Sequence, residues 1–356
     1  MQGVCGDFMK NIVLSKEDIR DICLSLSMLF RSGVGFGDGF SLMSEDEPKG
    51  KIKELLQEMA DMADEGKGAA DVFRETGVFP KYVIGLIEAG ERTGRLEEAF
   101  SSLADYYDSR IRLENHIRSA LLYPMVLLII MILVIGVLLV KVMPVFDGVY
   151  RQLGSGLTGM AGGLLELGVI LDKCMPAVLL ILSALIIFTA VFALVPKFRG
   201  WLGLKWNKSQ GSKGVTGELN AAKTAQVISM GLRSGLPFEE IFELAGELMA
   251  DVPEIEMKCR KCADELSQGG SLSDTIKKYD ILPLAECRIL EVALRGGMAD
   301  EAIFDIAKRL MTESEEAFET KISRVEPALV IVTSFMVGAI LLSVILPLVN
   351  IMASIG

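Results

Sequence analysis

Three long stretches without a charged residue constrain the fold of this 356-residue chain more than any other feature. They cover residues 121–140, 174–195 and 327–351. An α-helix rises ~1.5 Å per residue, so about 20 residues cross the ~30 Å hydrocarbon core of a bilayer. Hydrophobic residues make up 51% of the chain and charged residues 23%, so the two kinds are segregated along the sequence. The pattern predicts three transmembrane helices joined to soluble domains.

The basic residues beside these stretches predict their orientation, because Lys and Arg collect on the cytoplasmic side of membrane helices. Segment 144–173 holds only Arg151 and Lys173. The other flanks are richer in basic residues: Arg110, Arg112, Arg118, Lys197, Arg199, Lys205, Lys208, Lys321 and Arg324. We therefore expect a multi-pass protein of the cytoplasmic (inner) membrane, with a cytoplasmic N-terminus and an extracytoplasmic C-terminus.

This topology divides the chain into a tail, two cytoplasmic domains, three spans and one outer loop. The tail is 1–15 and the outer loop is 144–173. The cytoplasmic domains are 16–118 and 197–325. The predicted spans are 119–143, 174–196 and 326–351.

The two predicted domains look like copies of one unit. The segment 27–33, SMLFRSG, matches 229–235, SMGLRSG, at an offset of 202. An offset of 203 then relates Glu88, Arg92 and Gly94 to Glu291, Arg295 and Gly297, Pro124 to Pro327, and Pro144 to Pro347. The chain is thus predicted to be a duplication of a cytoplasmic domain plus one span, with the middle span as connector.

Each domain is predicted to be a helical bundle, which makes the whole chain all-α. Apolar residues recur at helical spacing over 19–30, after a Ser15–Asp18 pair typical of a capping box. Gly33 is a natural helix stop. The glycines at 33, 35, 37 and 39 predict a flexible connection between helices.

Sites for chemistry are hard to find in the sequence. The net charge of −11 argues against direct nucleic-acid binding, and 203–209 lacks the second glycine of a phosphate-binding loop. Cys259 and Cys262 share an apolar helix face and are interpreted as core residues, and His116 is the only histidine. We expect no catalytic site, cofactor or metal. A transporter or channel, and a membrane-tethered enzyme using the cysteine pair or acidic clusters, remain as alternatives.

Several short motifs occur in a recognisable order. They are GERTGRL at 90–96, LYP at 122–124, VMPVF at 142–146 and QLG at 152–154, followed in the second copy by RSG at 233–235, LP at 282–283 and EP at 326–327. This series, over nearly the whole chain from residue 16, resembles the type II secretion system F family, which includes the inner-membrane platform proteins of type IV pili.

The resemblance implies a non-enzymatic platform that couples a cytoplasmic hexameric assembly ATPase to the insertion of pilin or pseudopilin subunits into a filament. Other inner-membrane assembly components, the lipid bilayer and further copies of the chain are the remaining expected partners. The candidate contact or coupling residues are Arg31, Gly90, Glu91, Gly94, Arg233, Arg295 and Gly297.

The roles of individual candidates leave alternatives open. Glu91 either shapes a tight turn between helices or contacts a partner. The second copy departs from the first here, with Ala293-Leu294 in place of Gly90-Glu91. Pro124 and Pro327, at the cytoplasmic ends of spans, either start helices or act as hinges. Pro144 and Pro347, near the far ends, are candidate hinges.

Overall fold

A computed structural model of the chain describes residues 14–152, 172–195 and 214–355, with single positions 163, 166, 169, 170 and 198. All regular elements among these residues are helical, which confirms the predicted all-α class. The chain forms two compact units, Met1–Asn115 with Leu204–Glu316, and His116–Gly203 with Ala317–Gly356. Most of the predicted tail, much of the predicted loop 144–173 and the candidate phosphate loop 203–209 lie outside the described residues.

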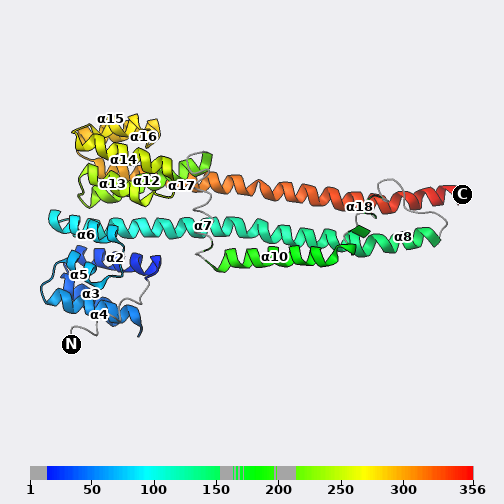
Figure 1. The fold of residues 1–356 in the computed structure, drawn as a ribbon, viewed down its shortest axis with the longest axis horizontal. Helices are drawn as coiled ribbons and strands as arrows, with labels where there is room; N and C mark the ends of the chain where they lie inside the picture. The colour runs from blue at the N-terminus through cyan, green and yellow to red at the C-terminus, as the bar shows by residue number, and fades with distance from the viewer. Residues whose placement is uncertain are drawn as a thin grey trace. The chain divides into compact units, whose positions relative to one another are not determined.

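The first repeat begins the first unit. Ser15 Oγ accepts a hydrogen bond from the Asp18 backbone N–H at 3.1 Å, and the Asp18 carboxylate accepts one from the Ser15 N–H at 2.8 Å, so the predicted capping box is confirmed. The helices that follow are α2 (Lys16–Arg31), α3 (Phe36–Asp46), α4 (Lys51–Asp64), α5 (Ala69–Thr76), α6 (Lys81–Thr93) and the start of α7 (Leu96–Val137) (Figure 1).

Gly33 and Gly35 lie in the connection between α2 and α3, but the segment from Phe36 onward is helical, so the prediction of a connection over all four glycines is wrong at Gly37 and Gly39. Gly37 and Gly39 both lie within α3. A Cβ at Gly39 would lie 3.5 Å from Leu29 Cδ1, and one at Gly37 would lie 2.5 Å from Asp64 Oδ1. Glycine lowers intrinsic helix propensity, but here it lets α3 pack closely on its neighbours, and that packing outweighs the propensity.

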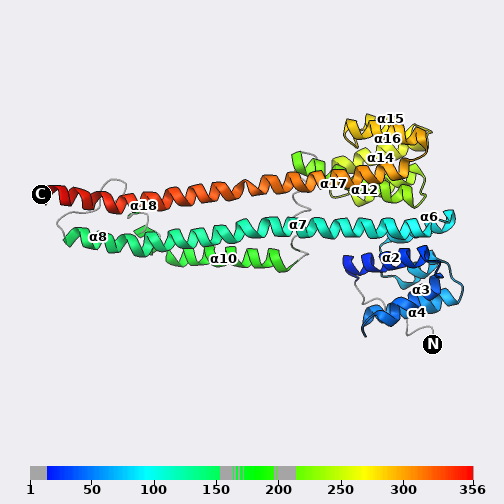
Figure 2. The same ribbon diagram turned by 180° about the vertical axis from the view of Figure 1, so that it is seen from behind.

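The second repeat reproduces the helices of the first. Its helices begin 202 residues after the starts of α3 and α4, and 203 residues after those of α5, α6 and α7. The second repeat comprises α12 (Gly214–Arg233), α13 (Phe238–Leu248), α14 (Pro253–Ser267), α15 (Leu272–Lys278), α16 (Leu284–Gly296) and α17 (Ala299–Ser323) (Figures 1 and 2). The internal duplication predicted from the sequence is therefore present in the fold.

The second unit contains the apolar helices. They are the C-terminal part of α7, a π-helical turn η1 (Leu138–Val142), α8 (Met143–Gln152), α10 (Met175–Leu194) and α18 (Val325–Ile355). The Tyr123 hydroxyl of α7 donates a hydrogen bond to the Glu326 carboxylate of α18 at 3.0 Å. Tyr123 and Glu326 are repeat-equivalent positions, so the two apolar helices meet near corresponding points.

Two helical stretches among the described residues are long and apolar enough to cross a membrane, Leu96–Val149 and Ala299–Leu342. Only 6% of each of their most apolar windows is buried, which is typical of helices that face lipid rather than a protein core. A shorter apolar helix covers Leu179–Leu194. The structure thus gives two candidate spans by length and composition, and the third stays a prediction.

Candidate functional site

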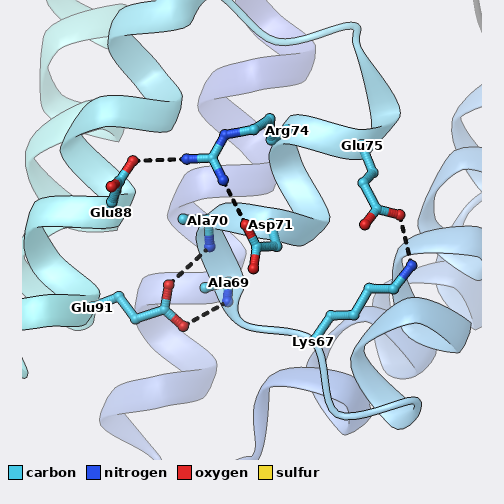
Figure 3. A network of polar contacts seen from close by, with 8 residues as sticks. All are labelled: Lys67, Ala69, Ala70, Asp71, Arg74, Glu75, Glu88 and Glu91. Atoms are coloured by element: carbon cyan, nitrogen blue, oxygen red, sulfur yellow. Dashed lines mark hydrogen bonds and ion pairs between the residues drawn. The ribbon is translucent and has the colours of Figure 1, made fainter.

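The side chain of Glu91 caps the N-terminus of α5. Its carboxylate accepts hydrogen bonds from the backbone N–H groups of Ala69 at 2.8 Å and Ala70 at 3.1 Å (Figure 3). The N-terminal amides of a helix lack intrahelical partners and carry a partial positive charge. Gly68 provides no side-chain cap, and a Cβ there would lie 2.6 Å from a Glu91 oxygen. The contacts of Glu91 therefore include a cap on a neighbouring helix, a role that sequence reasoning did not identify.

Exposed ion pairs surround this cap. Arg74 of α5 pairs with Asp71 and, at 2.7 Å, with Glu88 of α6, while Lys67 pairs with Glu75 at 2.6 Å (Figure 3). The hydrogen bond to Glu75 raises the pKa of Lys67. Such solvent-exposed pairs contribute little to stability, so among the polar contacts between α5 and α6 we assign the largest contribution to Glu91.

The two glycines beside Glu91 set the corner between α6 and α7. A Cβ at Gly90 would lie 2.7 Å from Ala99 Cβ and 3.0 Å from the Arg95 carbonyl oxygen. Gly94 ends α6 in the left-handed region at φ +71°, which side chains with a Cβ rarely adopt. The motif at 90–96 is thus a close helix–helix corner with a capping carboxylate on its outer side.

The corresponding corner of the second repeat is built differently. Gly297 ends α16 at φ +73°, as Gly94 ends α6, but Ala293 and Leu294 replace Gly90 and Glu91. A groove of about 370 Å³ separates α16 from α17, with Ala293 and Ala302 among its lining residues. Ala293 and Ala302 are the repeat equivalents of Gly90 and Ala99, and the α6–α7 corner leaves no room for a Cβ at position 90.

Arg233 joins the two repeats within the first unit. Its guanidinium lies 2.8 Å from the Asp105 carboxylate, donates to Ser101 Oγ at 3.2 Å, and stacks over the Phe304 ring at 4.8 Å. It thereby contacts α7 of the first repeat and α17 of the second. Asp105 lies 128 residues away in sequence, and no local pattern singled it out as a partner.

The residues after Arg233 continue this junction. Ser234 is fully buried, and its hydroxyl lies 3.3 Å from that of Ser102 in α7. Gly235 has φ +78°, and a Cβ there would lie 2.9 Å from Thr93 Oγ1. A polar cavity of about 350 Å³ opens beside Arg233 between α7, α12 and α17.

The other candidate side chains lie apart from this junction. Arg31, the repeat equivalent of Arg233, is 81% exposed and lies 3.7 Å from Glu97. Arg295 is 78% exposed and pairs with Glu291 at 2.6 Å. Arg233 is therefore the one candidate arginine that the fold places between the repeats, and Arg31 and Arg295 remain accessible to partners.

The prolines differ in their helical positions. Pro124 lies inside α7, so the interpretation that it starts a helix is wrong. Pro144 is the second residue of α8 and Pro327 the third of α18, and both lie inside the longer helical stretches Leu96–Val149 and Ala299–Leu342. Pro347 lies inside α18. A hinge role for any of them stays a prediction.

The cysteine pair behaves as a core feature, as predicted. Cys259 and Cys262 are fully buried in α14, and burial raises the pKa of each thiol to about 12. Within the part of the chain that the structure describes, no three His, Cys, Asp or Glu side chains are grouped to hold a metal ion. Buried neutral thiols are poor nucleophiles, so this pair gives no support to enzyme chemistry.

Comparison with protein families finds one match, repeated along the chain. The family model described as type II secretion system (T2SS), protein F, matches residues 22–144 and again 224–347. Each match covers most of one repeat together with all or most of the apolar stretch that follows it.

Individual relatives agree over most of the chain. The type IV pilus assembly protein PilC of Pseudomonas aeruginosa is 22% identical over 93% of this chain and 89% of its own length. The type II secretion system protein F of Vibrio cholerae is 23% identical over 94% and 82%. PilC of Thermus thermophilus is 21% identical over 96% and 84%.

Proposed function

Because the chain belongs to the type II secretion system protein F family, we propose that it is the inner-membrane assembly platform of a type II secretion or type IV pilus-like machine. It couples a cytoplasmic hexameric assembly ATPase to the insertion of pilin or pseudopilin subunits into a filament, alongside other inner-membrane components. It catalyses no reaction itself. The observation that carries this proposal is the family match to both repeats, together with relatives named for pilus assembly and type II secretion.

The proposed topology places both repeats in the cytoplasm. The chain crosses the membrane three times, at 119–143, 174–196 and 326–351. An odd number of crossings from a cytoplasmic N-terminus leaves the C-terminus outside. The basic residues beside the spans support this arrangement. The described apolar helices Leu96–Val149 and Ala299–Leu342 support the first and third crossings, and Leu179–Leu194 lies within the second.

The proposed coupling passes through α7. This helix runs without a break from Leu96, beside the Glu91 cap, to Val137 in the apolar stretch. A force applied by the ATPase to the first repeat would therefore act on a continuous helix that enters the membrane. Glu91, Gly90 and Gly94 hold the cytoplasmic start of α7 against α6 and α5, which is where we place the coupling contact.

The test is crosslinking in cells that assemble the filament. Photoreactive residues at exposed positions near the cap, such as Glu88 and Arg92, should capture an assembly ATPase, and residues in α18 should capture a pilin-like subunit. Deleting the chain should abolish filament assembly while leaving subunit synthesis intact. Normal assembly in the deletion strain, or capture of neither partner, would refute the platform role.

A further inference from the structure

A polar cavity within the first unit has two long walls that are repeat equivalents of each other. It has a volume of about 350 Å³ and is bounded by α7, α12 and α17. The wall from α7 belongs to the first repeat and the wall from α17 to the second, and the two helices run in the same direction within this unit (Figures 1 and 2). Positions related by the offset of 203 therefore lie on opposite sides of one space.

The charges on these two walls are opposite at equivalent positions. Asp105 of α7 corresponds to Lys308 of α17, and Arg112 of α7 corresponds to Glu315 of α17. All four side chains line the cavity. The duplication has thus placed an acidic group opposite a basic group at two levels, with the order of the charges reversed between them.

One of the two facing pairs is not formed in this structure. Asp105 pairs instead with Arg233 of α12 at 2.8 Å, and among the described residues no ion pair includes Lys308. Arg112 pairs with Asp108 of its own helix. A carboxylate has about four acceptor positions on its two oxygens, so Asp105 can bind Lys308 without releasing Arg233.

The wall from α12 carries a further group that this arrangement leaves unsatisfied. Gln226 Oε1 is buried and has no hydrogen-bond partner within the described part of the chain. A buried acceptor without a partner is unfavourable. The ammonium group of Lys308 is a donor on the wall opposite, so an approach of α17 would bring a donor toward both Gln226 and Asp105.

We propose that α7 and α17 close on this cavity, so that Lys308 pairs with Asp105 and Glu315 pairs with Arg112. The structure described above is the open arrangement. Exposed ion pairs contribute little to stability, and closing also displaces water from polar walls. The two arrangements therefore differ little in free energy, and both are populated.

The two moving helices lead into the candidate spans. The first, α7, continues without a break to Val137, and Ala299–Leu342 is one helical stretch that includes α17. Closure of the cavity therefore changes the spacing of these helices where the apolar stretches begin. This link to filament assembly rests on the proposed function, whereas the closure itself rests on the charges and geometry of the two repeats.

The experiment measures distances by pulsed EPR in the purified full chain in detergent. Spin labels are placed at Arg110→Cys and Glu313→Cys, exposed repeat-equivalent positions outside the cavity lining, in a background without native cysteines. Two distances are expected, one that matches this structure and one that is shorter. The matched control carries labels at Glu301→Cys and Glu313→Cys, both on α17, and should give a single distance.

Charge reversal then tests the pairing. Lys308→Glu should lower the short-distance fraction at least about threefold, because like charges that face each other oppose closure. Arg112→Glu should act in the same direction, and adding Glu315→Arg should restore most of the fraction. Because Lys308 forms no ion pair in the open arrangement among the described residues, Lys308→Glu should leave the thermal unfolding midpoint unchanged.

Salt tests the same pairing without a substitution. Raising the ionic strength from about 0.15 M to about 1 M shortens the Debye length from about 8 Å to about 3 Å, so the short-distance fraction should fall. A single distance that matches this structure would overturn the proposal, as would a short distance that neither charge reversal nor salt changes. Either result leaves capture of the ATPase by the probes at Glu88 and Arg92 unaffected, so failure of the closure is distinguishable from failure of the proposed function.

Discussion

Glu91 illustrates how a side chain singled out by a sequence motif can have an unforeseen structural contact. Its position in the motif at 90–96 was evident from the sequence, whereas its bonds to Ala69 and Ala70, 22 and 21 residues away, depend on how α5 is placed. The second repeat has Leu294 at this position, which carries no hydrogen-bond acceptor, and Ser271 provides no side-chain cap at the start of α15. The cap is thus specific to the first repeat.

Glu91→Ala should destabilise the first repeat by about 1 kcal/mol, the usual cost of losing a helix N-cap. Hydrogen exchange of the full chain in detergent should show faster exchange across Ala69–Thr76. Glu88→Ala is the matched control, because it removes only an exposed ion pair with Arg74 and should change stability by less than about 0.5 kcal/mol. Equal exchange in the two variants would contradict the capping role.

The buried cysteines predict a dependence of stability on alkaline pH. Burial raises the folded-state pKa of Cys259 and Cys262 from 9.0 to about 12, so the folded chain keeps protons that the unfolded chain releases. This stabilising contribution is complete below pH 9 and is lost as the pH rises toward about 12.

Thermal unfolding between pH 8 and pH 10.5 measures this loss. The native chain should lose more stability over this interval than the Cys259→Ala/Cys262→Ala variant, which lacks these two thiols. A variant with the same pH dependence as the native chain would show that the thiols are not held neutral by burial.

At the scale of elements, the spacing of apolar residues predicted helices well where they carry ordinary core side chains. The buried face of α2, with Ile19, Ile22 and Leu26, follows the apolar spacing over 19–30. The prediction failed at α3, because glycine has a low helix propensity and Gly37 and Gly39 therefore argue against a helix. In the structure, Asp64 and Leu29 lie so close to these positions that glycine leaves room for them.

The α6–α7 corner gives a matched pair of glycine variants. Gly90→Ala should destabilise the chain by about 1–3 kcal/mol, because its Cβ would lie 2.7 Å from Ala99 Cβ. Gly85→Ala, in the same helix, meets no atom within 4 Å and should be neutral or stabilising by up to about 1 kcal/mol. Thermal unfolding of both variants measures the difference, and equal effects would show that the corner is not closely packed.

The junction between the repeats gives a second matched pair. Arg233→Ala removes contacts with Asp105, Ser101 and Phe304 and should cost about 1–3 kcal/mol, as hydrogen bonds to charged groups do. The same substitution at the exposed equivalent Arg31 should cost less than about 0.5 kcal/mol. Unfolding midpoints compare the two, and a larger loss at Arg31 would contradict the described junction.

At the scale of the whole molecule, the duplication and the helical class were predictable because the repeat offset and the apolar stretches are properties of the sequence itself. The pairing of Arg233 with Asp105 was not, because it depends on how one repeat is placed against the other. Arg31 and Arg233 are the same residue type at equivalent positions of the two repeats. The sequence alone therefore does not show that Arg31 is exposed and that Arg233 joins the repeats.

The central claim is that the chain crosses the bilayer three times with both repeats on the cytoplasmic side. Single cysteines at exposed turns of the two repeats, Glu65→Cys and Gln268→Cys, report this directly in a background without native cysteines. In intact spheroplasts a membrane-impermeant maleimide should label neither position and should label both after permeabilisation, whereas a cysteine added after Gly356 should be labelled without permeabilisation. Labelling of position 65 or 268 in intact spheroplasts would contradict the account.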